Sequence, residues 1–280
     1  MDTIYMMLEK LIHDHSDQSE IIFDVSWALN YCQNDPSQRH IIFERGFHVF
    51  LAKHVRNGIV KNSKAALKAL VVLSLAENSD IQKLIDTNIF DLCQELFELD
   101  EEFFKKESIL ILGNIALGEI SQKVALIQHS VFEKILMQIS KLSKLCAYEA
   151  FFLITHIVNT NNIDFLKMLF RAYPQILTVF MNSISDKTTD YTLIERQLDA
   201  VNLLLLMQKP LEVDISLMAE EIGVVDVLEA LQYHESIKIY EMAGRIIEDH
   251  FSMDDNVENA QKFMELQSKM NEDSESRFNF

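Results

Sequence analysis

Two short runs of side chains could support chemistry, one by holding a metal ion and one by acid–base catalysis. A His-Asp-His run occupies positions 13–15, and three carboxylates follow one another at positions 100–102. The histidines lack a third ligand at helical spacing, so no metal site is expected there. The carboxylates lie in a charged segment without the apolar surroundings that would raise a pKa for catalysis. Phosphate-loop, dinucleotide-binding, nucleophile-elbow and zinc-protease motifs are absent from the sequence. We therefore predict a protein that is not an enzyme and that needs no cofactor or metal.

The cysteines and the apolar segments indicate where the protein acts. Cys32, Cys93 and Cys146 lie far apart and form no Cys-x-x-Cys pair, which argues against both a disulfide framework and a zinc site. Such usage is typical of the reducing cytoplasm and nucleus. The apolar runs are too short to cross a bilayer, and the N-terminus lacks the basic start and apolar core of a signal peptide. We expect a cytoplasmic and nuclear protein without a membrane partner.

The charge balance favours some partners over others. Acidic side chains number 43 against 25 basic ones, which gives a net charge of −18. Nucleic acid is not an expected partner, because phosphate binding needs clustered lysine and arginine. A negative protein attracts basic partners, although the same balance also simply keeps a protein soluble.

A helical segment that recurs along the sequence would position any binding residues. Similar apolar helical segments recur at intervals of 41, 42, 42, 47 and 41 residues, anchored at Trp27, Lys68, Leu110, Phe152, Asp199 and Tyr240. A period near 42 without a strand pattern, and with only 6 glycines and 3 prolines, is typical of armadillo or HEAT repeats. We predict an all-α fold, a right-handed superhelical solenoid of about six three-helix armadillo repeats. Such a stack presents a long concave surface to another chain.

Local signals suggest where the repeats begin and end. Asp35-Pro36 and residues 78–80 and 159–162 read as turns between helices, Gly46 lies near another, and Ser121 is a possible N-cap. We expect a capping helix over residues 1–20 and the repeats over residues 21–252. Residues 253–280 are polar and acidic, and we predict that this tail is largely disordered.

Several segments carry a resemblance to a known family. VVDVLEALQYHESIKIYEMAGRIIEDHFSMDD at 224–255, KESILILGNIALG at 106–118, SWALNYC at 26–32 and ALKALVV at 66–72 stand at successive repeat positions. Together they resemble the C-terminal half of importin-α, the armadillo-repeat adaptor of nuclear protein import. The resemblance covers roughly residues 20–255 and corresponds to repeats five to ten of the family's ten.

The resemblance implies a concave groove for basic nuclear localisation signals. In the family, tryptophans hold the aliphatic stems of lysine and arginine, and asparagines one helical turn away hold the peptide backbone. The matching positions here are Trp27, Tyr31, Lys68, Glu107, Leu110, Asn114, Phe152 and His156. Trp27 alone keeps the aromatic slot and Asn114 alone keeps a family asparagine. As alternatives, Trp27 would be buried between helices, Asn114 would be bonded inside the stack, and Glu107 would lie on a solvated face.

The resemblance also implies contacts with two transport receptors. Residues at the end of the chain match the family's contact with its export receptor, namely Glu229, His234, Glu235, Asp249, Asp254 and Asp255. The basic N-terminal arm that binds importin-β and the repeats of the major signal-binding site have no counterpart, which argues against importin-β as a partner. We predict an importin-α-like adaptor that binds basic cargo segments. The alternative is a diverged armadillo scaffold that lacks signal recognition and binds the export receptor or another protein as a regulator.

Overall fold

The computed structural model describes residues 2–15, 18–32, 35–56, 59–185, 190–212 and 214–251, and within these ranges all regular structure is helical. The prediction of an all-α fold is therefore confirmed. Contacts divide the chain into two compact units, with the boundary between Leu153 and Ile154, and each unit is described by itself. No described helix combines the length and apolar character needed to cross a bilayer. The predicted tail at 253–280 lies outside the described residues.

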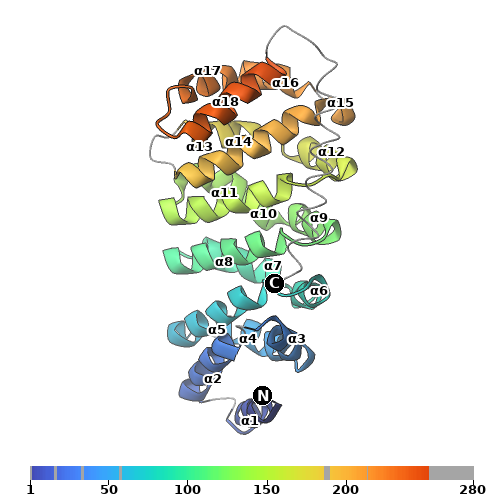
Figure 1. Cartoon of the computed structure of the whole chain (residues 1–280). Coiled ribbons are helices and arrows are strands. Elements are labelled where there is room, and N and C mark those ends of the chain that lie inside the picture. The colour runs from blue at the N-terminus through green and yellow to red at the C-terminus, as the bar shows by residue number, and fades with distance from the viewer. Residues whose placement is uncertain are drawn as a thin grey trace. The chain divides into compact units, whose positions relative to one another are not determined.

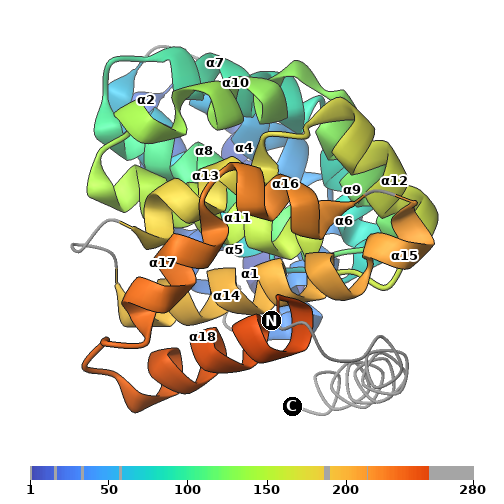
Figure 2. The same ribbon diagram turned by 90° about the horizontal axis from the view of Figure 1, so that it is seen from above.

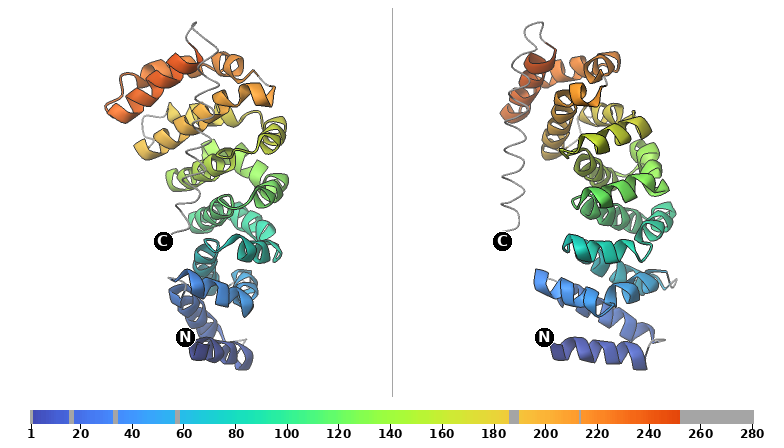
Figure 3. Two further views of the ribbon diagram at one scale, coloured as in Figure 1. Left: turned by 45° about the vertical axis from the view of Figure 1, so that its right-hand side comes forward. Right: turned by 90° about the vertical axis from the view of Figure 1, so that its right-hand side faces the viewer.

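The first unit repeats a series of three helices. After α1 (Asp2–Asp14), each long helix is followed by two shorter ones: α2 (Ser19–Cys32), α3 (Pro36–Glu44), α4 (Phe47–Val55), α5 (Val60–Leu73), α6 (Asn78–Ile85), α7 (Ile89–Glu98), α8 (Glu102–Ile115), α9 (Ile120–Gln128), α10 (Ser130–Gln138), the short 3-10 helix η1 (Ile139–Lys141) and α11 (Lys144–Val158). We call α2, α5, α8 and α11 third helices, because α5, α8 and α11 each close a three-helix repeat after two shorter helices and α2 is the corresponding long helix before α3. Within this unit α2, α5 and α8 lie along one side and α3, α6 and α9 along the other (Figure 1). The helices follow one another in chain order from blue to green (Figure 3).

Capping residues explain where several short helices begin. Pro36 opens α3 directly after Asp35, whose carboxylate accepts a hydrogen bond from a backbone amide of the first turn at 2.9 Å. Gly46 adopts a left-handed φ of 72° between α3 and α4, a conformation that glycine reaches without a steric penalty. Asn162 caps α12 (Ile163–Ala172), because its side-chain oxygen accepts a hydrogen bond from the Phe165 amide at 2.8 Å. The turns predicted at these three places are confirmed.

Two other local predictions are wrong. Residues 78–80 form the first turn of α6 rather than a turn between helices, and buried Asp80 bonds to His40 of the preceding repeat. Helix α9 is capped by Glu119 and not by Ser121, which lies inside its first turn. Glu119 and the glutamine at N3 form a reciprocal capping box, which satisfies two free amide groups where a serine cap would satisfy one.

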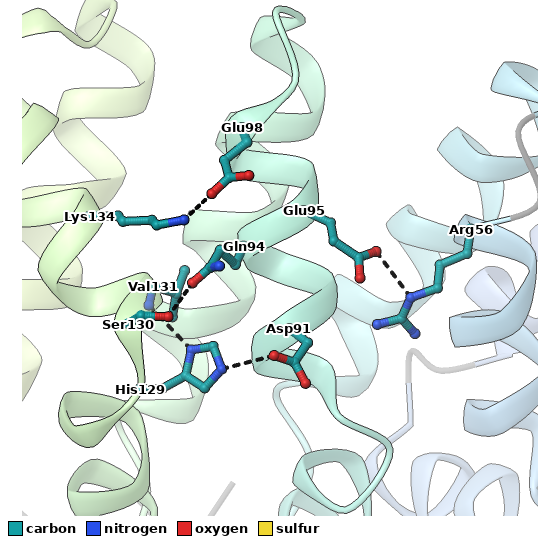
Figure 4. Close-up of polar contacts among 9 residues, drawn as sticks. All are labelled: Arg56, Asp91, Gln94, Glu95, Glu98, His129, Ser130, Val131 and Lys134. Atoms are coloured by element: carbon teal, nitrogen blue, oxygen red, sulfur yellow. Dashed lines mark hydrogen bonds and ion pairs between the residues drawn. The ribbon is translucent and has the colours of Figure 1, made fainter.

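Polar side chains on α7 and α10 and at the end of α4 join successive repeats (Figure 4). Helix α7 contacts α10 and the end of α4 through side chains that lie 36–39 residues apart in the sequence. The pairs are Arg56–Glu95, Asp91–His129, Gln94–Ser130 and Glu98–Lys134. Exposed ion pairs contribute at most about 1 kcal/mol each. This ladder therefore helps to set the register between repeats, and the apolar core supplies most of the stability.

A histidine takes the place of a phenylalanine at one repeated position of the core. His48, Phe90 and Phe132 are buried at the starts of α4, α7 and α10, and each lies 42 residues from the next. The ring of His48 packs 4.8 Å from the ring of Phe43, and its Nδ1 atom has no hydrogen-bond partner. Burial lowers the pKa of His48, and the nearby Lys83 ammonium lowers it further. The folded chain therefore keeps this imidazole neutral where the unfolded chain would protonate it.

We expect His48→Phe to reduce the loss of stability in acid. Because the pKa of His48 is lowered on folding, its contribution is complete above the unfolded value of about 6.5 and is lost as the pH falls below it. The stability advantage of the variant over the wild type should therefore be larger at pH 5.5 than at pH 7.5. Urea unfolding at the two pH values measures this difference. Equal pH dependence of the two proteins would contradict the prediction.

The second unit begins with the last turn of α11 and continues through seven further described helices. They are α12 (Ile163–Ala172), α13 (Ile176–Ile184), α14 (Tyr191–Leu206), α15 (Gln208–Leu211), α16 (Ile215–Glu221), α17 (Val224–Leu231) and α18 (Ile237–His250). Helix α18 runs beside α14 and packs against α17 (Figure 2). The six anchor positions of the sequence repeat all fall on long helices, namely α2, α5, α8, α11, α14 and α18.

Candidate functional site

Half-exposed side chains recur along the third helices of the first unit, and we call the surface that they form the third-helix face. On α2, α5 and α8 they are spaced three or four residues apart, and on α11 two adjacent residues precede a third by four and three residues, which places each set on one side of its helix. The face comprises Phe23, Trp27 and Tyr31 on α2, Lys61, Lys64 and Lys68 on α5, Phe103, Lys106, Leu110 and Asn114 on α8, and Tyr148, Glu149 and Phe152 on α11. It contains aromatic rings, cations and a carboxylate, but no arrangement of a nucleophile and a base.

Helix α2 carries a row of aromatic rings. The rings of Trp27 and Tyr31 stack with their centroids 5.8 Å apart, and Phe23 meets Trp27 edge-on at 6.3 Å. Trp27 is half-buried, whereas Tyr31 is 69% exposed. Trp27 is thus neither a core residue nor a free surface ring. Its predicted role in peptide binding stays a prediction.

The lysines of α5 point at aromatic rings of both neighbouring third helices. The Nζ atom of Lys61 lies 3.8 Å from the ring centroid of Phe23 on α2. The Nζ atoms of Lys64 and Lys68 lie 5.1 and 5.4 Å from the ring centroid of Phe103 on α8. All three distances are within the range of cation–π attraction.

A buried carboxylate lies beneath these lysines. Glu107 has a side chain only 2% exposed, and its Oε1 atom lies 2.7 Å from Lys68 Nζ and 3.9 Å from Lys106 Nζ. Its Oε2 atom has no hydrogen-bond partner. Lys106 also lies 4.0 Å from Glu149. Burial raises the pKa of Glu149, the Lys106 ammonium lowers it, and neighbouring Glu107 raises it again. Glu107 therefore does not lie on a solvated helix face, which was the alternative stated for it from the sequence.

Asn114 bonds within the stack of repeats. Its amide nitrogen donates to Ser74 Oγ at 2.8 Å and to the Val71 carbonyl at 3.4 Å, both at the end of α5. One of the two alternatives stated for this residue is therefore present, although the side chain remains half-exposed. Leu110 lies one turn before it on the same side and is also half-exposed. Whether either residue also contacts a peptide stays a prediction.

The predicted export-receptor residues divide into two groups in the second unit. His234 and Glu235 lie in the turn before α18, where His234 packs edge-on against the Tyr191 ring at 4.7 Å and Glu235 accepts a hydrogen bond from the Tyr191 hydroxyl. Glu229 is exposed on α17. Asp249 lies at the other end of α18, about 20 Å away by helical rise. Asp254 and Asp255 lie outside the described residues. His156, from the predicted groove, is half-buried in the last turn of α11.

Sequence reasoning missed several residues of the third-helix face. They are Phe23, Lys61, Lys64, Phe103, Lys106 and Tyr148 as members of one surface. Phe23 could have been found, because it lies four residues before Trp27. The lysines of α5 show helical spacing too, but their aromatic partners are about 40 residues away in the chain.

One cluster of potential metal ligands is already neutralised by a lysine. Ligand atoms of His40, Glu44 and Asp80 lie within 4.8 Å of one another. The Lys83 ammonium lies 2.5 Å from Glu44 and 2.9 Å from Asp80, and His40 Nδ1 lies 2.9 Å from the other oxygen of Asp80. The ammonium group takes the position that a cation would occupy, so this cluster joins α3 to α6.

Comparisons with known proteins establish the fold. The structure is similar to computationally designed armadillo repeat proteins for modular peptide recognition, with a TM-score of 0.74 and 20% identity over 87% of this chain and 98% of that one. It is also similar to a designed armadillo repeat protein in complex with the peptide (KR)4, with a TM-score of 0.72 and 22% identity over 87% and 97% of the two chains. The chain therefore has the predicted armadillo-repeat fold of about six repeats.

Sequence comparison adds a partial relation to a particular group. The family described as "Atypical Arm repeat" matches residues 214–264. A stretch of 76 residues is 41% identical to importin subunit alpha-3 of Caenorhabditis elegans. That match covers 26% of this chain and 15% of the relative's length.

Proposed function

We propose that this protein is an importin-α-like adaptor that binds basic peptide segments, such as nuclear localisation signals, on its third-helix face. The observation that carries the proposal is the aromatic row on α2, where Trp27 stacks on the exposed ring of Tyr31. Asp24 is exposed three residues before Trp27 and therefore lies beside it on the helix surface. An aromatic face next to a carboxylate attracts a lysine or arginine side chain through its charge and its methylene stem.

A second group on α11 has the same composition. The rings of Tyr148 and Phe152 lie 4.8 Å apart, and Glu149 is half-exposed between them in the sequence. The partial identity to importin subunit alpha-3 and the structural likeness to an armadillo protein in complex with (KR)4 support a basic peptide as the ligand. The net charge of −18 would increase the rate of encounter with such a peptide.

We expect Trp27→Ala to weaken binding of a labelled (KR)4 peptide at least fivefold. The loss of one cation–π contact and of the stem packing on the ring accounts for a change of about 1 kcal/mol or more. Fluorescence anisotropy at two salt concentrations measures the affinity, which should fall at the higher salt because the attraction is screened. Trp27→Phe should retain most of the affinity.

Tyr233→Ala is the matched control, since this ring is 92% exposed but lies in the second unit. It should leave the affinity unchanged. If Trp27→Ala and Tyr233→Ala bind (KR)4 equally well, the α2 row is not a peptide site.

A second candidate function is favoured by the surface around α18. Four large side chains are exposed at the starts of α14 and α18 and in the turn between α17 and α18, namely Tyr191 at 42%, Tyr233 at 92%, Ile237 at 73% and Tyr240 at 50%. Tyrosine is enriched in protein interfaces, and this patch adjoins His234 and Glu235. The alternative proposal is a scaffold that binds the importin-α export receptor, or another protein, through this end. Binding of the purified export receptor that is lost in Tyr233→Ala but kept in Trp27→Ala would support it.

A further inference from the structure

Helix α5 presents three lysines on the third-helix face, and we call Lys61, Lys64 and Lys68 the lysine row. Each ammonium group lies over an aromatic ring of a neighbouring third helix, at 3.8 Å for Lys61 over Phe23 and at 5.1 and 5.4 Å for Lys64 and Lys68 over Phe103. An aromatic face within about 6 Å of an ammonium group attracts it. The rings that could receive cations from a ligand are thus already in contact with cations of the chain.

The carboxylates beside these rings are paired with the same lysines. Lys64 forms an ion pair with Glu101, and Lys68 forms one with Glu107 at 2.7 Å. The Glu107 side chain is 2% exposed, and its second oxygen has no hydrogen-bond partner. Because burying an unpaired charge is costly, Lys68 is held firmly at this carboxylate. An aromatic face and a carboxylate together make a cation site, and here both parts are satisfied internally.

We infer that the lysine row acts as a built-in occupant of the cation sites around α5 and so determines the specificity of the third-helix face. This inference rests on the proposed function, the binding of basic peptides. A bound basic side chain meets the stacked rings of Trp27 and Tyr31 on α2, which lie beside the exposed carboxylate of Asp24. Opposite α5 it meets three ammonium groups and must displace them. The row therefore rejects basic side chains at this position.

The lysines of the row remain partly accessible to a ligand. The side chains of Lys64 and Lys68 are 39% and 40% exposed, so an approaching lysine or arginine would meet their charge in solvent. Lys106 of α8 lies beside Glu107 and adds a fourth ammonium group to the same region. Removal of the row should expose Phe23, Phe103 and Glu101 to a ligand cation.

The test replaces the row by methionine, which keeps the aliphatic stem and the helix propensity but not the charge. The variant Lys61→Met/Lys64→Met/Lys68→Met is compared with Lys10→Met/Lys53→Met/Lys141→Met, which removes three exposed lysines elsewhere in the first unit. Both variants change the net charge equally, so general electrostatic attraction of the peptide cancels. Binding of labelled (KR)4 is measured by anisotropy, and folding is checked by circular dichroism.

The row variant should bind (KR)4 about tenfold more tightly than the control variant, because each vacated aromatic face contributes a factor of about two to five. Adding Phe103→Ala to the row variant should remove most of the gain. In case the triple variant fails to fold, Lys61→Met/Lys64→Met leaves Lys68 on Glu107 and is compared with Lys10→Met/Lys53→Met. This pair should still differ about fourfold.

The outcomes separate the inference from the proposed function. If the wild type binds (KR)4 and the row and control variants bind it equally, the inference is overturned and the proposed function stands. If only the row variant binds, the inference is supported and the native protein is not a receptor for uniformly basic peptides. If no protein binds, both fail, because vacated sites that attract no cation are not cation sites.

Discussion

Phe132→Ala should lower the free energy of unfolding of the first unit by about 4 kcal/mol. Phe132 is fully buried in α10, between the short helix and the third helix of its repeat. Truncation removes the transfer free energy of the ring and leaves a cavity that a stack of short helices closes only in part. Urea unfolding followed by circular dichroism measures the change. The expected effect exceeds that of any single exposed ion pair in the ladder between α7 and α10.

Met137→Ala provides the control for this measurement. Met137 lies on the same helix five residues later and is 66% exposed, so its truncation should change stability by less than about 0.5 kcal/mol. A loss below 1 kcal/mol in Phe132→Ala would contradict the placement of α10 in the core. A loss confined to Phe132→Ala would confirm that the buried positions of the 42-residue period hold the repeats together.

The repeat itself could be predicted because it depends on local patterns. Apolar residues at helical spacing specify the long helices, and recurrence near 42 residues specifies how many similar units follow one another. The anchor positions accordingly fall on α2, α5, α8, α11, α14 and α18. The turns at Asp35, Gly46 and 159–162 were predictable for the same reason, since their residues act on the adjacent backbone.

The predicted helix boundaries were wrong where a residue distant in the sequence stabilises the helix. An Asn-Ser-Asp run favours a turn by local preference, yet Asp80 is buried within α6. Its carboxylate receives His40 from the preceding repeat and Lys83 from its own helix. Those bonds stabilise the helical form by more than the preference for a turn, and His40 is 40 residues away in the sequence. A sequence window of ten residues around Asp80 does not include His40.

The candidate site was predictable along each helix and not between helices. A spacing of four residues correctly places Trp27 beside Tyr31. The pairing of Lys61 with Phe23, and of Lys68 with Glu107, depends on the register between neighbouring third helices. The family resemblance assigns Lys68 and Glu107 to a peptide groove as separate residues. In the structure they form one ion pair, which is a property of the packed stack.

The ion pair between Lys68 and Glu107 makes Lys68 more important for stability than Lys64. Lys68→Ala should lower the free energy of unfolding by about 3 kcal/mol, and Lys64→Ala should lower it by at most about 1 kcal/mol. The two lysines lie one turn apart on α5, have side chains 40% and 39% exposed, and each pairs with a glutamate. Only the partners differ, since Glu101 is 41% exposed and Glu107 is 2% exposed. Water can solvate Glu101 once its lysine is gone, but Glu107 would keep a buried charge whose nearest remaining cation is Lys106 at 3.9 Å.

Glu107→Gln in the Lys68→Ala background tests the cause directly. Glutamine keeps the shape of the side chain and removes the charge, so the double variant should recover about 2 kcal/mol of the loss. The same substitution combined with Lys64→Ala should recover nothing, because Lys68 is still present in that background and Glu107→Gln removes the charge of its partner. Equal losses in Lys64→Ala and Lys68→Ala, or no recovery with Glu107→Gln, would show that the penalty comes from lost packing of the lysine stem. Unequal losses with recovery would identify Glu107 as the buried charge that holds Lys68, and with it the lysine row, against the third-helix face.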